Sequence, residues 1–270
     1  MKTRKILSIL LTLAMAIGLL ALTPVIAHAE APITVGNATE LAAALSSAVN
    51  GDTIKLTADI TYGTLINISG NAITFDLNGF TLNATRGLRV SGGKVLLADP
   101  ANGEFNVTNS TSSFCVEAYG SDPQIEITSA AINSTAPTGG YAIYGNAGQI
   151  IVYGNVKQEK TGATAEDCGA WVMSGNITIE GEMTVSGGAT YASFGPRNDT
   201  AINKTREQHT TPSTKPGYFT YTDGKGTIWV KDPNYVPPPA KGIFGTNARY
   251  QGWWAYLLFF VGFGFIWMWF

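Results

Sequence analysis

The largest group of chemically versatile side chains lies in a polar segment, residues 195–218. Five basic or titratable residues fall within it: Arg197, Lys204, Arg206, His209 and Lys215. Long polar segments on rigid scaffolds often carry binding residues. Positive charge here could meet the uronates of a polysaccharide or the phosphates of a teichoic acid. A solvated loop without a ligand is the alternative interpretation.

Two tyrosines and two glutamates are further candidates. Tyr119 and Tyr144 each precede a glycine, and we expect them to share a column of the repeat described below. Their rings could stack on sugars, although packing at a corner explains them as well. Glu180 and Glu182 could make a weak cation contact, but a solvated edge is the simpler explanation. The candidate ligand-binding residues are therefore Arg197, Lys204, Arg206, His209, Tyr119 and Tyr144.

Metal, cofactor and catalytic-triad chemistry find little support in the sequence. His209 is the only histidine after residue 29, and one histidine with two cysteines does not provide a convincing zinc site. Calcium needs several oxygen ligands that converge on one point. The outward columns of the repeat carry no cluster of acidic residues, so calcium binding is unsupported. The glycines do not form a phosphate-cradling loop between a strand and a helix. We predict no cofactor, no metal and no catalytic residue.

The first 29 residues resemble an export signal. Lys2, Arg4 and Lys5 precede the apolar run 6–22, and Ala27-His28-Ala29 fits a small-residue cleavage site. This layout predicts a signal peptide over residues 1–29 and an exported protein; an uncleaved membrane anchor is the alternative. Export permits a disulfide between Cys115 and Cys168, but the sequence does not show that the two residues meet, and two buried free thiols are the alternative.

Charge excludes a nucleic-acid partner. After removal of the three basic residues of the signal, 14 Lys and Arg stand against 19 Asp and Glu, a net charge of −5. Such a chain offers no basic stripe for phosphates. Only 13% of all residues are charged, whereas glycine and small polar residues are abundant, which is typical of strands and turns.

The C-terminal segment Trp253–Phe270 carries no charged residue. At about 1.5 Å per residue it is long enough to span most of a bilayer core of about 30 Å. Tryptophans at both of its ends resemble aromatic belts. The segment therefore predicts a transmembrane helix and a cell-surface protein, with a buried core helix as the alternative. Residues 233–252 form a linker that Pro237–Pro239 would stiffen.

A loose repeat occupies residues 30–232. Glycines recur every 20 to 30 residues, at positions 70, 92, 120, 145, 175, 195 and 224, and alternating strand patterns follow most of them. Three short strands per repeat predict an all-β, right-handed parallel β-helix whose coils stack on one another. An antiparallel sandwich explains the alternation but not the constant order of strands around the glycines.

A capping helix is expected before the repeat, at about residues 38–50. Asn37 is a suitable N-cap with Glu40 three residues later, and Leu41, Ala44, Leu45 and Val49 form an apolar stripe. Gly51 lies where such a helix would stop. The helix would cover the apolar core that the first coil otherwise exposes.

Two motifs carry a family resemblance. The segment "VGNATELAAALSSAVNGDTIKL" resembles the entry segment of parallel β-helix proteins of the pectin-lyase-like superfamily, and "ITFDLNGFTL" is similar to coils of its bacterial secreted members. The resemblance covers about two hundred residues and specifies architecture better than activity. It implies that an enzyme of this kind would cleave acidic polysaccharides, with calcium-binding carboxylates on adjacent coils and an arginine base, or with clustered aspartates.

Stacking allows a test of that implication, because neighbouring coils share columns. In the column of Asp76 no two acids are adjacent; it reads Asp76, Ala98, Thr128, Tyr153, Glu180 and Lys231. The next outward column reads Thr74, Leu96, Glu126, Ile151, Thr178 and Trp229. Asp76 is therefore expected to be structural or solvated, and Asn78-Gly79 to be a coil corner rather than a hairpin turn.

The expected function is a non-catalytic, membrane-tethered surface protein with a structural, adhesive or polysaccharide-contacting role. The alternatives are a polysaccharide lyase or glycoside hydrolase, with Arg197, Arg206 and Glu180 as its strongest candidates, and a carbohydrate-binding module.

Overall fold

The computed structural model describes residues 31–135, 139–196 and 200–238. The predicted signal peptide, Arg197 and the apolar segment Trp253–Phe270 lie outside the described residues, as does the linker after Pro238. Among the residues that are described, no helix is long and apolar enough to cross a membrane.

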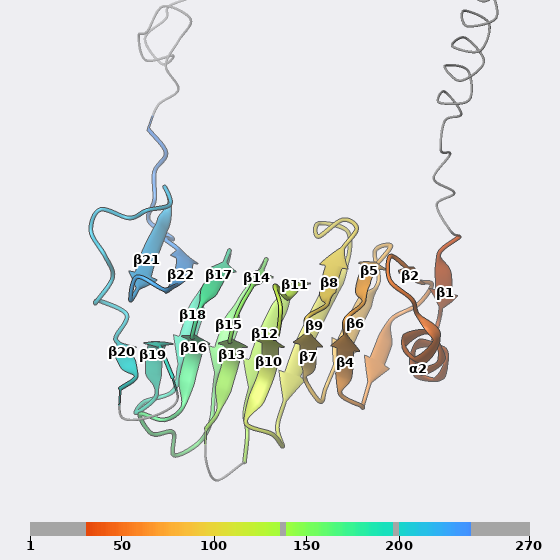
Figure 1. The fold of residues 1–270 in the computed structure, drawn as a ribbon, viewed down its shortest axis with the longest axis horizontal. Coiled ribbons are helices and arrows are strands. Elements are labelled where there is room, and N and C mark those ends of the chain that lie inside the picture. Colours follow the sequence, from red (N-terminus) through yellow and green to blue (C-terminus); the bar gives the residue numbers. More distant parts are fainter. Residues whose placement is uncertain (1–30, 136–138, 197–199, 239–270) are drawn as a thin grey trace, which may run out of the picture. The chain divides into compact units, whose positions relative to one another are not determined.

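The described chain forms a parallel β-solenoid of about six turns with one short helix, which confirms the predicted β-helix architecture (Figure 1). Sheet A contains β1 (Ile33–Val35), β2 (Thr53–Leu56), β5 (Ala72–Asp76), β8 (Lys94–Leu97), β11 (Gln124–Ile127), β14 (Gln149–Val152), β17 (Gly175–Ile179), β22 (Gly226–Lys231) and β21 (Tyr218–Thr222). Sheet B contains β3 (Ile60–Tyr62), β6 (Thr81–Ala84), β9 (Glu104–Asn109), β12 (Ser129–Ile132), β15 (Val156–Gln158) and β18 (Met183–Val185). Sheet C contains β4 (Ile66–Ser69), β7 (Leu88–Ser91), β10 (Phe114–Tyr119), β13 (Tyr141–Gly145), β16 (Cys168–Val172), β19 (Thr190–Phe194) and β20 (Ile202–Lys204).

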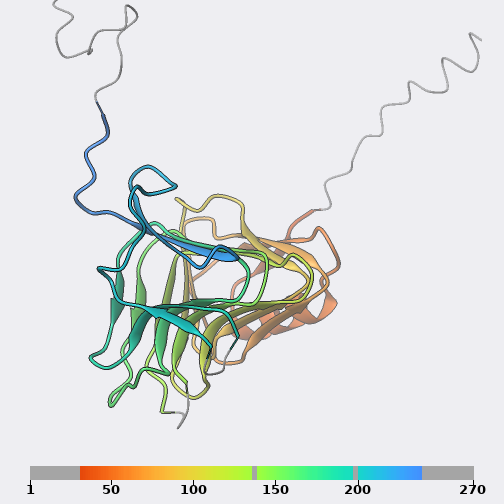
Figure 2. The ribbon, with the colours of Figure 1, turned by 60° about the vertical axis from the view of Figure 1, so that its left-hand side comes forward.

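Each strand pairs with the same strand of the neighbouring coils, so the coils wind around one shared interior (Figure 2). The register confirms the predicted outward column: Thr74 pairs with Leu96, Glu126 with Ile151, and Thr178 with both Ile151 and Trp229. Only β20 and β21 run antiparallel to their partners among the described strands. Both lie at the C-terminal end of their sheets.

The interior is filled by alternate side chains of all three sheets. Phe75 and Phe105 are fully buried, and their ring centroids lie 5.2 Å apart. Asn78-Gly79 is a coil corner, as expected, because β5 and β6 pair with other coils rather than with each other. The corners between sheets A and B vary from one residue, Thr128, to six residues, 98–103, without disturbing the register of the strands that they join.

The capping helix, α2 (Ala38–Ser47), begins as predicted and ends earlier. The Asn37 side chain accepts hydrogen bonds from the backbone N–H groups of Thr39 and Glu40, and the Glu40 carboxylate accepts one from the N–H of Gly36. The prediction that Val49 belongs to the apolar stripe of this helix was wrong. Val49 is 57% exposed, because the helix ends before it and Ala48 occupies the last buried position.

The glycine corners are also confirmed, with one correction. Gly145 ends the buried strand β13, whereas Gly148 supplies the positive φ (+73°) of that corner. A Cβ added to Gly148 would lie 2.0 Å from the carbonyl oxygen of Pro123 in the preceding coil. Glycine is required there for conformation and for close stacking.

The two cysteines are buried free thiols, so the alternative of a disulfide is excluded. Cys168 lies in the column of Phe114 and Tyr141, two coils beyond the strand that contains Cys115. Two coils are separated by about 9.5 Å, which is too far for a disulfide. Burial raises the pKa of the Cys115 thiol to about 12 and also raises that of Cys168.

Replacement of Gly148 by Ala tests the stacking of corners. Gly70 has the same φ of +73°, but no atom lies within 4 Å of the position that a Cβ would occupy, so Gly70→Ala is a matched control. In both variants the left-handed conformation should lower the free energy of unfolding by about 1–2 kcal/mol. In Gly148→Ala the overlap with Pro123 should lower it by about 1–3 kcal/mol more. Urea unfolding measures both losses, and equal losses would contradict the stacking argument.

Thiol titration tests the cysteine environment. At pH 8 neither buried thiol should react with a disulfide reagent in the native protein, because reaction requires the thiolate and both pKa values are raised. Two thiols should react after denaturation. Rapid reaction of either thiol in the native state would show that the sheet opens at that strand.

Candidate functional site

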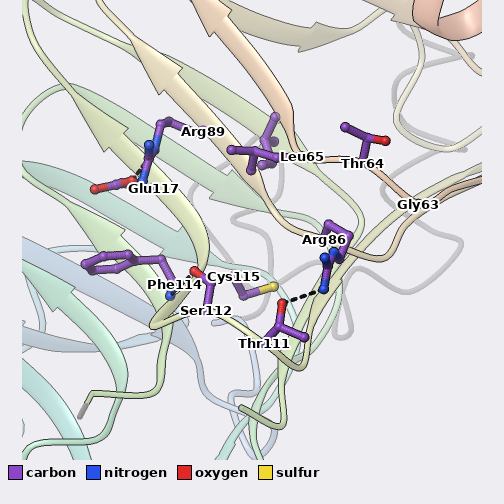
Figure 3. Close-up of a pocket in the computed structure, with 11 residues that line it drawn as sticks. Gly63, Thr64, Leu65, Arg86, Arg89, Thr111, Ser112, Phe114, Cys115 and Glu117 are labelled. Atoms are coloured by element: carbon purple, nitrogen blue, oxygen red, sulfur yellow. Dashed lines mark hydrogen bonds and ion pairs between the residues drawn. The ribbon is translucent and has the colours of Figure 1, made fainter. Parts of the chain in front are cut away.

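A groove on the outer side of sheet C is the clearest candidate site (Figure 3). It encloses about 370 Å³ at the beginnings of strands β4, β7 and β10. Its side chains come from three successive coils and include two arginines, one carboxylate, one aromatic ring and three hydroxyl groups: Arg86, Arg89, Glu117, Phe114, Thr64, Thr111 and Ser112.

The register of the coils positions the charged side chains. Arg89 pairs with Glu117 of the next coil, and the Arg89 Nε lies 2.5 Å from a Glu117 carboxylate oxygen. Arg86 donates a hydrogen bond of 2.8 Å to the Thr111 hydroxyl. Arg86 is exposed and the Arg89 side chain is 39% exposed. Their guanidinium groups therefore keep N–H donors available to an anionic ligand.

Asn109 holds the loop that forms one wall. Its amide nitrogen donates to the carbonyl oxygens of Arg86 and Phe114, and its amide oxygen accepts from the N–H groups of Thr111 and Ser112. Asn109 is only 3% exposed. The groove is therefore built on a buried polar side chain that links two coils.

An aromatic cluster borders the groove. Phe114 stacks on Tyr141 at 5.3 Å between ring centroids and contacts Tyr144 at 5.2 Å, and Trp171 packs against both tyrosines. Trp171 also donates a 2.8 Å hydrogen bond to the carbonyl oxygen of Gly195. These rings form a second apolar cluster outside the interior of the solenoid.

The predicted pairing of the two tyrosines was wrong. Tyr144 pairs with Glu117, and Tyr119 pairs with Ser91, so the tyrosines do not share a column. Their corners differ in length, because the glycine with positive φ is Gly148 rather than Gly145. Tyr144 is only 8% exposed, so its ring packs against protein. Phe114 is the aromatic side chain that lines the groove.

Carboxylates on the coils make structural contacts. Asp76 forms an ion pair of 2.6 Å with Lys55 of the preceding coil, which supports its expected structural role. Glu126 accepts a hydrogen bond of 3.0 Å from the N–H of Leu97. The fully buried Asp167 contacts Lys160 at 3.0 Å. Within the described ranges, no group of three potential metal ligands converges.

The polar segment after Gly195 closes the C-terminal end of the solenoid. The Tyr221 hydroxyl donates a 2.6 Å hydrogen bond to the carbonyl oxygen of Arg206, and the ring of His209 lies 4.7 Å from that of Phe219. The ammonium group of Lys204, by contrast, lies over the ring of Phe194 and not beside Tyr221 or Phe219. The candidates Lys204, Arg206 and His209 therefore do not converge on one point, and Arg197 lies outside the described residues.

A second cleft, of about 250 Å³, lies at this end. The Arg206 guanidinium lies 3.7 Å from the Glu182 carboxylate at its rim. Glu180 is held by the Tyr218 hydroxyl and by Lys215 and Lys231 at 3.7 and 3.6 Å. Burial and the hydrogen bond to Glu180 both raise the pKa of Tyr218.

Arg86, Arg89 and Phe114 were not among the binding residues expected from the sequence. A usable signal existed for one pair, because Arg89 and Glu117 are opposite charges at equivalent positions of adjacent coils. Comparisons with protein-family models, with curated proteins and with solved structures found no match for this chain.

The buried tyrosines should lower the free energy of unfolding at high pH. Burial raises the pKa of Tyr191 to about 12 and that of Tyr221 as well, whereas an unfolded tyrosine titrates with a pKa of about 10. The folded state thus retains protons that the unfolded state releases, so the free energy of unfolding should fall as pH rises above about 10. Tyr191→Phe should flatten this fall in urea titrations at several pH values. Identical slopes for both proteins would contradict the assignment.

Proposed function

We propose that this protein is a non-catalytic β-helix scaffold, related in architecture to the pectin-lyase-like proteins, that contacts acidic polysaccharide outside the cell. The proposal includes export through residues 1–29 and a membrane tether at Trp253–Phe270. The contact surface is the groove of sheet C.

The groove's charge and shape carry the proposal. Arg86 and Arg89 lie three residues apart in the sequence at the beginning of β7, and both line the groove together with Phe114 (Figure 3). A uronate supplies a carboxylate for such donors and a ring face for an aromatic side chain. The hydroxyl groups of Thr111 and Ser112 add polar contacts for sugar hydroxyls.

The use of carboxylates supports a role without catalysis. Acid–base chemistry on a glycosidic bond uses two carboxyl groups at a matched separation. Here Glu117 forms an ion pair with Arg89. Asp76 forms one with Lys55, and Asp167 forms one with Lys160. These contacts stabilise the stacking of coils and loops instead of presenting a pair of carboxylates to a substrate.

A lyase or hydrolase is the second candidate, and one observation favours it. The chain brings Glu180, Glu182 and Arg206 to a single cleft, and Glu180 and Arg206 are two of the residues that the sequence suggested for such an enzyme. A pure carbohydrate-binding module would share the groove with the favoured proposal.

Binding to polygalacturonate tests the proposal. The double variant Arg86→Ala/Arg89→Gln should weaken binding at least about tenfold, because each charge-assisted hydrogen bond contributes about 1.5–3 kcal/mol. Calorimetry measures the change, and Lys225→Ala is the control for loss of an exposed cation elsewhere. Unchanged binding by the double variant would contradict the groove assignment. Release of unsaturated sugars from the polymer would favour the lyase.

A further inference from the structure

Three Asn-Gly pairs occur in the chain, at residues 50–51, 78–79 and 102–103. Each lies between two elements of secondary structure, and all three asparagines are exposed. An asparagine before a glycine can lose its amide without an enzyme, because the next backbone nitrogen can attack the side-chain carbonyl and glycine has no side chain to block the approach. Exposure does not distinguish the three pairs, so the hydrogen bonds around them decide which one reacts.

Stacking of the coils protects the first pair. The N–H of Gly51 donates a hydrogen bond of 2.8 Å to the carbonyl oxygen of Ala72. The side-chain oxygen of Asn50 accepts one of 2.8 Å from the N–H of the same residue. The nitrogen that would attack and the carboxamide that it would attack are therefore both held by the first residue of β5, and reaction would have to break both hydrogen bonds.

The second pair is held by the coils on both of its sides. The N–H of Gly79 donates a hydrogen bond of 3.1 Å to the carbonyl oxygen of Asn102 in the following coil. The side-chain amide of Asn78 donates one of 3.1 Å to the carbonyl oxygen of Leu56 in the preceding coil. The same two groups are thus engaged here as in the first pair.

The third pair, Asn102-Gly103, has neither kind of contact. Within the part of the chain that the structure describes, the N–H of Gly103 donates no hydrogen bond and the Asn102 carboxamide has no hydrogen-bond partner. The backbone of Asn102 is nevertheless fixed, because its N–H donates to the carbonyl oxygen of Asp99 at 3.1 Å and its own carbonyl accepts from Gly79. The hydrogen bond to that carbonyl also draws electron density from the Gly103 nitrogen and eases loss of its proton.

We propose that Asn102 is a site of spontaneous deamidation in the native protein, whereas Asn50 and Asn78 are protected. The Gly103 nitrogen gives its proton to water and forms a bond to the side-chain carbonyl carbon of Asn102, and the amide nitrogen leaves as ammonia. A water molecule then opens the resulting cyclic imide at either of its carbonyl carbons. The product is an aspartate or an isoaspartate at position 102, with uptake of one water and release of one ammonia.

The corner between β8 and β9 accommodates either product. Isoaspartate adds one carbon to the main chain, and the corners between sheets A and B already differ in length while their strands keep the same partners. Either product places a new negative charge between Asp99 and Glu104 in the sequence. Deamidation therefore makes this edge of the solenoid more acidic with age and does not unwind a coil.

Peptide mapping by mass spectrometry tests the site on the full-length chain in mild detergent. During incubation of the folded protein at mildly alkaline pH, Asn102 should deamidate at least about tenfold faster than Asn50 or Asn78, because the latter two must first break two hydrogen bonds each. Asn102→Gln should remove the modified species, since glutamine closes the corresponding ring far more slowly. Equal rates at the three sites, or no reaction at Asn102 while the unfolded chain reacts, would overturn the proposal.

The chain unfolded in guanidinium chloride is the matched control. Without the fold all three asparagines should react at similar rates, because each is followed by glycine. If Asn102 kept the same advantage in the unfolded chain, the preference would come from local sequence, and protection by stacking would be refuted.

Urea unfolding tests whether the corner accommodates the products. The aged protein and the variant Asn102→Asp should both unfold at the urea concentration that unfolds the fresh protein. A lower midpoint for either sample would contradict the tolerance of the corner between β8 and β9.

Discussion

The repeated parallel pairing of equivalent strands is the constraint on which this structure depends. A parallel strand can satisfy its backbone groups only through neighbours on both sides, so each coil requires the next one in the same register. This requirement fixes which side chains point inward, and it also fixes which outward side chains meet. The ion pairs of Lys55 with Asp76 and of Arg89 with Glu117 are consequences of register, not of proximity along the chain.

The same constraint explains why both ends need special sequences. At the first coil, α2 covers the apolar interior with Leu41 and Ala44. At the last coil the polar segment and the antiparallel strands β20 and β21 take over that task for sheets A and C. Sheet B has no further strand beyond β18 among the described residues.

Most of the architecture could be predicted from sequence, because glycine corners and alternating apolar residues determine it directly. The prediction of the outward column Thr74 to Trp229 succeeded for this reason. Sequence reasoning failed where a local exception decided the outcome, as at Gly148, which replaces Gly145 as the corner glycine and shifts Tyr144 away from the column of Tyr119. The groove was missed because its arginines belong to ordinary strands and a short loop, and only the stacking of three coils brings them to Phe114.

The corners between sheets A and B show where this fold admits change. They range from the single residue Thr128 to the six residues 98–103, yet the strands on either side keep their partners. Length is thus decoupled from register at this edge, since an added residue bulges outward and does not slide the following strand. A row of such positions, one per coil, is a natural place for evolution or an engineer to graft new loops at a regular spacing along a rigid axis.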